Sequence, residues 1–205
     1  MNVEIEAKMR LIDRAAVESR LKELNAGVDA EWLEINTYFD TPQRGLKSSD
    51  QGLRIRTEVA ADGQRTVTIT HKGPRAHGRL KSRSECEVNV SDPGQAATLL
   101  RALGYAPVLS FEKRRQRWHL NDCHVEIDVL PYLGEFIEIE GGSEEAVLAV
   151  REQLGLKEAP LIRASYIAML MTYIRENQMQ EQAIRFNGST GPTESVDKIV
   201  AAAAD

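Results

Sequence analysis

The sequence predicts an α+β fold in which about eight antiparallel strands form one sheet and four amphipathic helices cover it. Two observations predict this class: strand-like runs follow one another with short gaps, and each of four helical segments has a single apolar stripe. A third observation is that charged residues recur at alternate positions of most strands. This alternation leaves two arrangements of the sheet to be weighed.

The strands are predicted from alternating apolar and polar residues between turn signals. The gaps at 61–63, 121–122 and 133–134 contain Gly, Asn or Asp and are short, which is typical of antiparallel hairpins and not of parallel crossovers. The predicted strands cover residues 2–10, 35–41, 52–59, 64–72, 80–90, 107–119, 123–130 and 134–141.

The helices are predicted from capping residues followed by apolar residues at helical spacing. Asp13, Asp92 and Ser143 can each cap an N-terminus, and Pro93 occupies the first helical position after Asp92. A glycine follows the end of each of these three helices, and a fourth helix begins near Ile162. Because each helix has one apolar stripe, each needs an apolar surface to pack against.

Charged residues alternate with apolar residues along the predicted strands. In VEIDV, Glu126 and Asp128 alternate with Val125, Ile127 and Val129. Successive side chains of a strand point to opposite faces, so the charges collect on one face of the sheet. The positions on that face are Glu4, Glu6, Lys8, Arg54, Arg56, Lys72, Arg83, Glu85, Glu87, Lys113, Arg115, Arg117, Glu126, Asp128, Glu138 and Glu140.

Two arrangements can hold this pattern. In an open sheet, the apolar face packs on the helices and the charged face meets water, as is common for antiparallel sheets. In a closed barrel, the charges line the interior and the helices cover the apolar outside. Eight strands are enough to enclose a small ligand, and closure removes exposed sheet edges. From the pattern alone, both arrangements stay open.

A charged barrel interior would indicate a particular kind of ligand. Buried charges are costly unless they are paired, hydrated or matched by a ligand. Clustered carboxylates suit hard divalent cations such as Mg²⁺ or Mn²⁺, whereas Lys and Arg suit phosphate oxygens. A triphosphate bound together with metal meets both demands.

Composition and length restrict the class of protein and its partners. The chain has 205 residues, of which 28% are charged, and a net charge of −5, which gives no reason to expect a nucleic-acid partner. Cys86 and Cys123 have no metal-ligand spacing, and no uncharged apolar run approaches about 18 residues. We therefore expect a cytoplasmic protein without a membrane partner. We predict one domain over 1–177, and over 178–205 the end of the last helix and a mobile tail with a short terminal helix.

Several motifs, taken in order, resemble those of the CYTH superfamily, also called triphosphate tunnel metalloenzymes, which includes class IV adenylate cyclases and thiamine triphosphatases. E-x-E-x-K alone is a weak pattern, but the resemblance continues in register over residues 2–175. It implies an eight-stranded antiparallel tunnel, so the closed barrel with a charged interior becomes the expected fold. The motifs are E-x-E-x-K at Glu4–Lys8, L-R-x-R at Leu53–Arg56, K-G-P at Lys72–Pro74, R-x-E-x-E at Arg83–Glu87, D-x-x-x-x-L-G-x-F-x-E-I-E at Asp128–Glu140, and RASY at Arg163–Tyr166.

The resemblance also implies roles for individual residues. The divalent-metal ligands it implies, for two Mg²⁺ or Mn²⁺ ions per site, are Glu4, Glu6, Asp128, Glu138 and Glu140. The implied triphosphate ligands are Lys8, Arg54, Arg56, Lys72, Lys113, Arg115 and Arg163. The implied catalytic set is Glu4, Glu6, Lys8, Glu138 and Glu140, and the supporting luminal acids are Glu85, Glu87 and Glu126.

The implied activity is metal-dependent chemistry on a small-molecule triphosphate. The spacing of residues 81–141 resembles the bacterial class IV cyclase branch, so conversion of ATP to cyclic AMP and pyrophosphate is the first expectation. The alternative is a triphosphatase acting on inorganic tripolyphosphate, thiamine triphosphate or a nucleoside triphosphate. A non-catalytic polyphosphate or nucleotide sensor is disfavoured, because a pure anion binder has little use for so many acids. A homodimer stays open.

Overall fold

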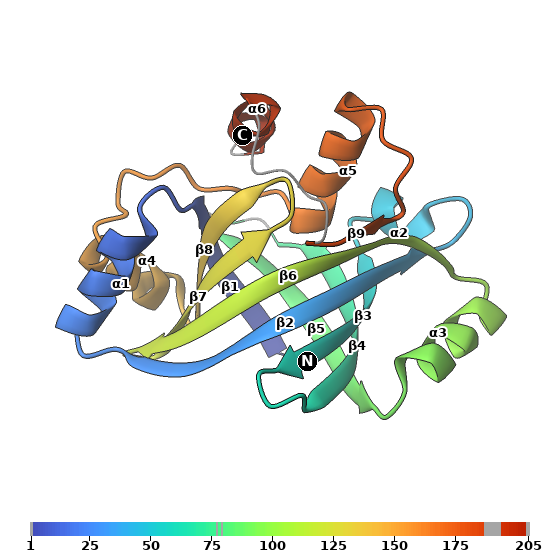
Figure 1. Ribbon diagram of the computed structural model, residues 1–205, viewed down its shortest axis with the longest axis horizontal. Helices are drawn as coiled ribbons and strands as arrows, with labels where there is room; N and C mark the ends of the chain where they lie inside the picture. The colour runs from blue at the N-terminus through green and yellow to red at the C-terminus, as the bar shows by residue number, and fades with distance from the viewer. Residues whose placement is uncertain (1, 77, 79, 187–193, 204–205) are drawn as a thin grey trace.

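Eight antiparallel strands of the computed structural model close into a barrel, as predicted (Figure 1). The structure describes residues 2–76, 78, 80–186 and 194–203, without the side chains of 2–4 and 194–197. Around the barrel the order is β2-β3-β4-β5-β1-β8-β7-β6, and pairing of β2 with β6 closes it. The strands are β1 (Asn2–Arg10), β2 (Gly27–Asp40), β3 (Gly52–Ala60), β4 (Arg65–Arg75), β5 (Lys81–Val90), β6 (Ala106–Leu120), β7 (Cys123–Leu130) and β8 (Gly134–Gly141).

The strand register sets the charged residues opposite one another. Lys8 of β1 pairs with Glu138 of β8, and Arg115 of β6 pairs with Asp128 of β7. The Arg115 guanidinium also contacts Glu138, although β7 lies between β6 and β8 in the sheet. Such a contact across an intervening strand shows that these charged side chains point into the barrel.

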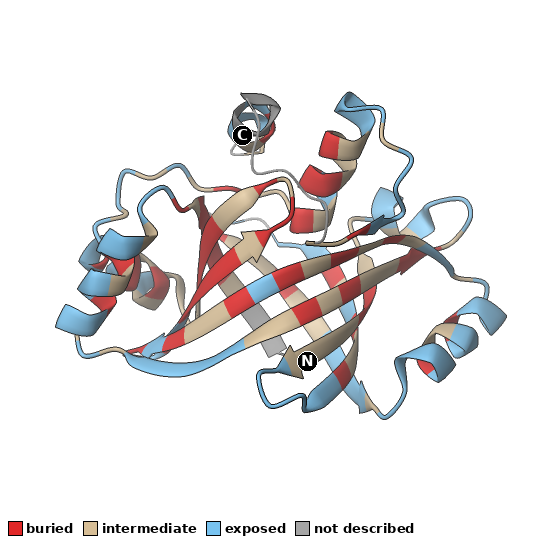
Figure 2. Ribbon diagram, in the orientation of Figure 1, coloured by how far each residue is buried: buried red, intermediate tan, exposed pale blue. Residues whose placement is uncertain are grey.

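The helices lie outside the barrel, with α1 and α4 at one end and α3 at the other (Figure 1). Asp13, Asp92, Ser143 and Ser165 cap α1, α3, α4 and α5, each accepting a hydrogen bond from a backbone N–H of the first turn. Figure 2 shows that α1 and α3 are exposed along most of their length. The helices are α1 (Arg14–Glu23), α2 (Gly45–Ser48), α3 (Pro93–Ala102), α4 (Glu144–Gln153), α5 (Tyr166–Glu176) and α6 (Glu194–Ala202).

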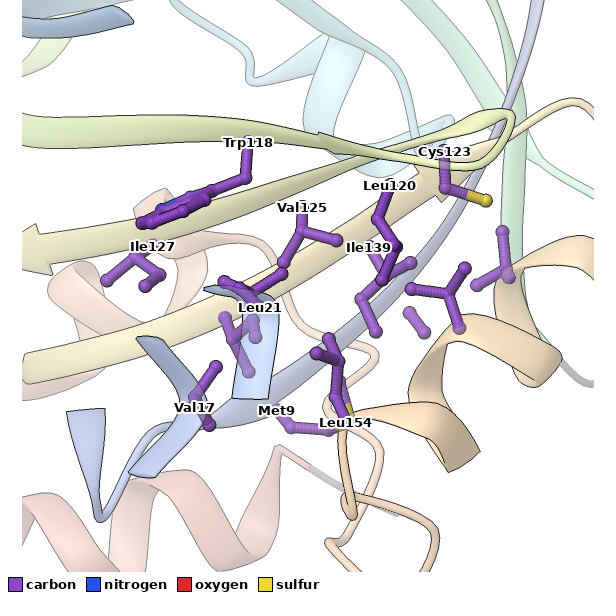
Figure 3. Close-up of a cluster of buried hydrophobic side chains, with 14 of the residues drawn as sticks. Met9, Val17, Leu21, Trp118, Leu120, Cys123, Val125, Ile127, Ile139 and Leu154 are labelled. Atoms are coloured by element: carbon purple, nitrogen blue, oxygen red, sulfur yellow. The ribbon is translucent and has the colours of Figure 1, made fainter. Parts of the chain in front are cut away.

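The hydrophobic core of the described residues is divided among three clusters, the first of which lies on the outer face of the barrel. The one drawn in Figure 3 joins β1, β7 and β8 to α1 and α4, through residues such as Met9, Leu21 and Val125. Trp118 belongs to this cluster, so its ring packs outside the barrel. A second cluster lies under α5 and α6, and a third under α3. No helix in the described part of the chain has the length and apolarity required to cross a membrane.

Several boundaries differ from the sequence prediction. Strand β2 begins at Gly27 and not at 35, because it pairs with β6 along its whole length. Helix α5 begins at Tyr166 and not near Ile162, because the Ile162 N–H donates to the Lys8 carbonyl and not within a helix. Neither α2 nor the short strand β9 (Ala183–Ile184), which runs parallel to β6, was predicted.

Cys86 of β5 is exposed, although it alternates with the charged residues Glu85 and Glu87 and so lies on the apolar side of its strand. Its neighbour on the same face, Val88, is 58% exposed. The reason is the placement of α3, which covers Leu53 and Ile55 of β3 instead.

Candidate active site in the tunnel

A cavity of about 1380 Å³ occupies the barrel interior and is large enough for a nucleotide-sized ligand. Every residue predicted to bind triphosphate lines this cavity. So do Glu85, Glu87, Glu138 and Glu140 among the predicted acids. Glu6, Glu126 and Asp128 are buried in the barrel wall and are not part of the cavity lining in the described structure. For Glu4 the backbone pairs with Arg83, and the side chain lies outside the described residues.

Arg115 is surrounded by four carboxylates from three strands, β2, β7 and β8. Its guanidinium donates two hydrogen bonds to Asp128, of 2.7 and 2.6 Å, and one of 2.5 Å to Glu138. It also contacts Glu126 and lies 3.7 Å from Glu34. Burial alone would lower the pKa of Arg115, but these acids raise it well above its usual value. We call these five residues the Arg115 network.

Asp128 is completely buried and already has a full set of donors. Its two oxygens accept four hydrogen bonds: two from Arg115, one of 3.1 Å from Lys113 and one of 2.9 Å from the Tyr166 hydroxyl. Burial and the Asp128 charge raise the pKa of Tyr166 well above its usual value, so the hydroxyl remains a donor. The sequence prediction did not include Tyr166 in the site, although it belongs to the RASY motif.

Lys8 lies between two predicted metal ligands. Its Nζ is 3.0 Å from Glu138 Oε1 and 3.7 Å from Glu6 Oε1, and it lies 4.1 Å from the centroid of the Tyr166 ring. Lys81 is a second partner of Glu6, at 2.6 Å. Burial favours protonation of Glu138, but Lys8, Arg115 and other cations hold its pKa well below the usual range. Glu138 is therefore an ionised carboxylate on the cavity wall.

Glu34 is a functional candidate that the sequence prediction missed. Its side chain is 0% exposed and lies 3.3 Å from both Arg56 and Lys113. Burial would raise the pKa of Glu34, but Arg56, Lys113 and Arg115 lower it well below its usual value. The signal was the alternation in WLEINTYF, which extends the polar face N-terminally from Asn36. The predicted strand began one residue too late to include it.

Arg54 differs from Arg115 because its charge is only loosely compensated. Arg54 is 6% exposed, and its Nη2 lies 3.4 Å from the Thr70 hydroxyl. Its acid contact is with the half-exposed Glu87, at 3.9 Å. Its buried Nε has no hydrogen-bond partner within the described structure. Tyr38 lies opposite Arg54 across β2 and β3. Burial would raise the pKa of Tyr38, yet Arg54 and Lys72 lower it, which indicates a positive local potential.

The supporting acids and the cations are arranged in pairs. Glu85 contacts Lys72, and Glu126 accepts hydrogen bonds of 2.6 and 2.8 Å from Arg117. Arg163 reaches the cavity from the segment before α5, where its Nη1 donates to the Gly78 carbonyl at 3.1 Å. Glu85 and Glu126, predicted as supporting luminal acids, are thus each held by a cation of a neighbouring strand.

The predicted metal ligands do not form a preassembled cluster in the described residues, where no group of three or more acids, histidines or cysteines is spaced to hold an ion. Glu138 and Glu140 nevertheless place carboxylate oxygens on the cavity wall. Oxygen donors of this kind suit Mg²⁺ or Mn²⁺, which usually keep waters and substrate oxygens as further ligands. The donor set therefore fits a divalent cation that arrives with its substrate.

One part of the cavity wall is apolar. Tyr38 and Phe111 stack with ring centroids 6.0 Å apart, and Val108 lies on the same strand as Phe111. Ile167 and Met171 line the cavity from α5, one helical turn apart. We call these five residues the apolar alcove. Tyr38 also lies opposite Arg54, so the alcove adjoins the loosely compensated cation.

Comparisons with known proteins agree with this architecture. Adenylate cyclase CyaB of Aeromonas hydrophila is 36% identical over 174 residues, which span 80% of this chain and 86% of the relative. Human thiamine-triphosphatase is 26% identical over 133 residues, 57% of this chain and 54% of the relative. A solved structure from Pyrococcus horikoshii covers 83% of this chain and 99% of its own, with a TM-score of 0.73 and 27% identity. The CYTH domain model matches residues 2–166, and the chain belongs to the CYTH family.

Proposed function

We propose that this protein is a divalent-metal-dependent enzyme that acts on an organic triphosphate, with the conversion of ATP to cyclic AMP and pyrophosphate as its first candidate reaction. The observation that carries the proposal is one cavity that holds the seven predicted triphosphate cations together with the ionised Glu138. A polyanion alone would satisfy the cations but would repel Glu138, whereas a triphosphate with a divalent cation satisfies both.

The apolar alcove supports an organic substrate over inorganic tripolyphosphate. An inorganic ligand has no apolar part, so it would leave Val108, Ile167 and Met171 facing water in the cavity. A nucleotide could place its base against Phe111 and Tyr38, and its phosphates against Arg54 and Lys72. The similarity to the adenylate cyclase of Aeromonas hydrophila, at 36% identity, also favours the cyclase reaction.

In this proposal the residues divide into holders of phosphate and holders of metal. Lys8, Arg54 and Lys113 would bind phosphate oxygens and stabilise charge in the transition state. Glu138 and Glu140, with Glu4 and Glu6, would hold Mg²⁺ or Mn²⁺. A bound metal would supply Lewis-acid neutralisation of phosphate charge. We assign Asp128 the role of orienting its hydrogen-bond donors Arg115, Lys113 and Tyr166, instead of its predicted role as a metal ligand. Four hydrogen bonds from these donors already occupy its oxygens.

The cyclase reaction joins the ribose 3′-oxygen to the α-phosphorus and breaks the bond from that phosphorus to the pyrophosphate oxygen. The hydroxyl proton must leave during this step. Glu138 has a strongly lowered pKa and so suits charge compensation better than proton uptake. We therefore assign the proton to water in the cavity and leave Glu138 ionised throughout.

A triphosphatase is the second candidate, favoured by the similarity to human thiamine-triphosphatase. There, water attacks the terminal phosphorus and the bond to its bridging oxygen breaks. The same cations and acids serve either reaction. What differs is which phosphorus lies beside the metal.

Product analysis distinguishes the candidates. Purified protein is incubated with Mg²⁺ or Mn²⁺ and one of three substrates at a time: ATP, thiamine triphosphate or tripolyphosphate. Cyclic AMP with equimolar pyrophosphate supports the cyclase, and orthophosphate supports the triphosphatase. Substrate binding without product formation, with either metal, would contradict the enzymatic proposal and would favour a non-catalytic sensor.

A further inference from the structure

The segment at residues 162–166 fixes Lys8 from several directions. The Ile162 N–H donates to the Lys8 carbonyl at 2.8 Å, and the Lys8 ammonium donates to the Ala164 carbonyl at 3.2 Å. The Tyr166 ring lies 4.1 Å from the same ammonium, while its hydroxyl is held by Asp128. Backbone and side chain of Lys8 are thus both positioned by one short segment.

That segment is held in turn from its other side by the C-terminal region. The backbone N–H groups of Arg163 and Ala164 donate to the Ala203 carbonyl, at 2.9 and 3.3 Å. Ile199 of α6 is 5% exposed and joins the apolar cluster that contains Ile162 and Tyr166. The structure places α6 beside α5 and above the barrel (Figure 1).

A second anchor precedes α6. Strand β9 pairs with β6 at Ser110 and Phe111, and its Ile184 is completely buried. The Phe186 N–H donates to Glu112 of β6 at 2.9 Å. The chain is therefore attached to the barrel on both sides of 187–193, which lie outside the described residues. The CYTH domain match ends at Tyr166, so β9 and α6 both lie beyond it.

We infer that residues 183–186 and 199–203 form a C-terminal clasp that positions Lys8 for the reaction. The inference rests on the proposed function, because it gives the clasp a task at the same phosphate-binding site. Ala203 and Ile199 hold the 162–166 segment, and this segment holds the Lys8 ammonium between Glu138 and Tyr166. The clasp residues are positioning residues and do not themselves line the cavity in the described structure.

Two matched full-length variants test the clasp. Ile199→Asp introduces a charge into the apolar cluster, whereas Lys198→Asp makes the same replacement at the exposed neighbouring residue. In Ile199→Asp, amide hydrogen exchange at Arg163 and Ala164 should rise about tenfold or more, while exchange in β6–β8 stays unchanged. Turnover should fall about 10- to 100-fold in kcat with a smaller change in KM, because the Lys8 ammonium is displaced. Lys198→Asp should match the wild type, and Ile199→Leu should restore both readouts.

The outcomes separate the clasp from the proposed function. Unchanged exchange at Arg163 and Ala164 would overturn the clasp, and so would faster exchange with unchanged kcat. If the wild type turns over no triphosphate, the proposed function fails. The ¹⁵N NMR signal of the Lys8 ammonium then tests whether the clasp positions Lys8. A signal that is the same in Ile199→Asp and Lys198→Asp would overturn it, and a signal shifted only in Ile199→Asp would support it.

Discussion

The Arg115 network and the surroundings of Arg54 both place a buried arginine in the tunnel, but they compensate its charge very differently. Arg115 contacts Asp128, Glu126 and Glu138 closely and Glu34 more distantly. Arg54 has one loose acid contact and an unpartnered Nε in the described structure. The comparison indicates a division of labour: the Arg115 network maintains the shape of the tunnel, and Arg54 keeps its charge available for an anionic ligand.

Removal of Arg115 should have the largest effect on stability. Arg115→Ala leaves Asp128, Glu126 and Glu138 in a buried cluster without their shared cation, which costs about 3–5 kcal/mol by analogy with other broken buried pairs. Urea unfolding followed by circular dichroism measures the loss. Arg117→Ala is the matched control, because Arg117 is partly exposed and forms an ion pair with Glu126 at the edge of the same network. Equal stability of the two variants would contradict a structural role for the Arg115 network.

Removal of Arg54 should instead affect ligand binding. Arg54→Ala should weaken tripolyphosphate affinity about 10- to 100-fold, which corresponds to one or two charge-assisted hydrogen bonds, with little change in the free energy of unfolding. Isothermal titration calorimetry gives the affinity. A variant that is strongly destabilised but still binds tripolyphosphate normally would reverse the proposed division of labour.

The apolar alcove should affect only the organic part of a substrate. Met171→Ser removes apolar contact in the alcove and should weaken ATP binding by about 1 kcal/mol, or about fivefold. Tripolyphosphate affinity should stay the same, since it has no apolar portion, and it serves as an internal control measured on the same variant. Parallel losses for both ligands would show that Met171 acts on the phosphate site and not on the base.

Acid should weaken the Arg115 network to a smaller, measurable degree. The folded-state pKa of Glu34 lies well below its usual value of 4.5, so folded protein binds fewer protons than unfolded protein near that pH. The stability that Glu34 contributes is therefore present above about pH 4.5 and is lost as pH falls towards the lowered pKa. Glu34→Gln should unfold with a shallower dependence on pH below 4.5 in urea titrations. An unchanged slope would contradict an ionised Glu34.

The charged and apolar faces of the strands could be predicted from the sequence because strand alternation is a local property, whereas closure of the barrel was expected only from the resemblance to the CYTH superfamily. The side of the sheet on which Glu126, Asp128 and Glu138 lie follows from the alternation within their own strands, without knowledge of the neighbouring strands. Glu34 was missed because the polar residues Asp29 and Glu31 precede it and obscure the alternation that would mark the start of β2. The exposure of Cys86 depends on where α3 packs, which is a tertiary choice that the strand itself does not encode.

The individual roles within the tunnel were harder to predict than its lining. All seven predicted triphosphate ligands line the cavity. Six of them lie on the charged side of their strands, which faces the barrel interior, and Arg163 reaches the cavity from the segment before α5. Asp128 also lies on the charged side of its strand, yet it is separated from the cavity by its donors Arg115, Lys113 and Tyr166. These four residues come from three elements, β6, β7 and α5, and meet only when the barrel closes and α5 packs against it. Whether an acid meets ligand or holds a cation is therefore fixed by tertiary contacts.

Glu138→Gln tests the central claim most directly, because this change removes the ionised carboxylate from a cavity otherwise rich in cations. Turnover of the preferred triphosphate with Mg²⁺ or Mn²⁺ should fall by about a thousandfold or more, as for other groups that compensate transition-state charge. Tripolyphosphate binding without metal should persist, since Lys8 and Arg115 each lose an acid partner and stay available to the anion. Wild-type turnover by Glu138→Gln would contradict metal-dependent triphosphate chemistry in this tunnel.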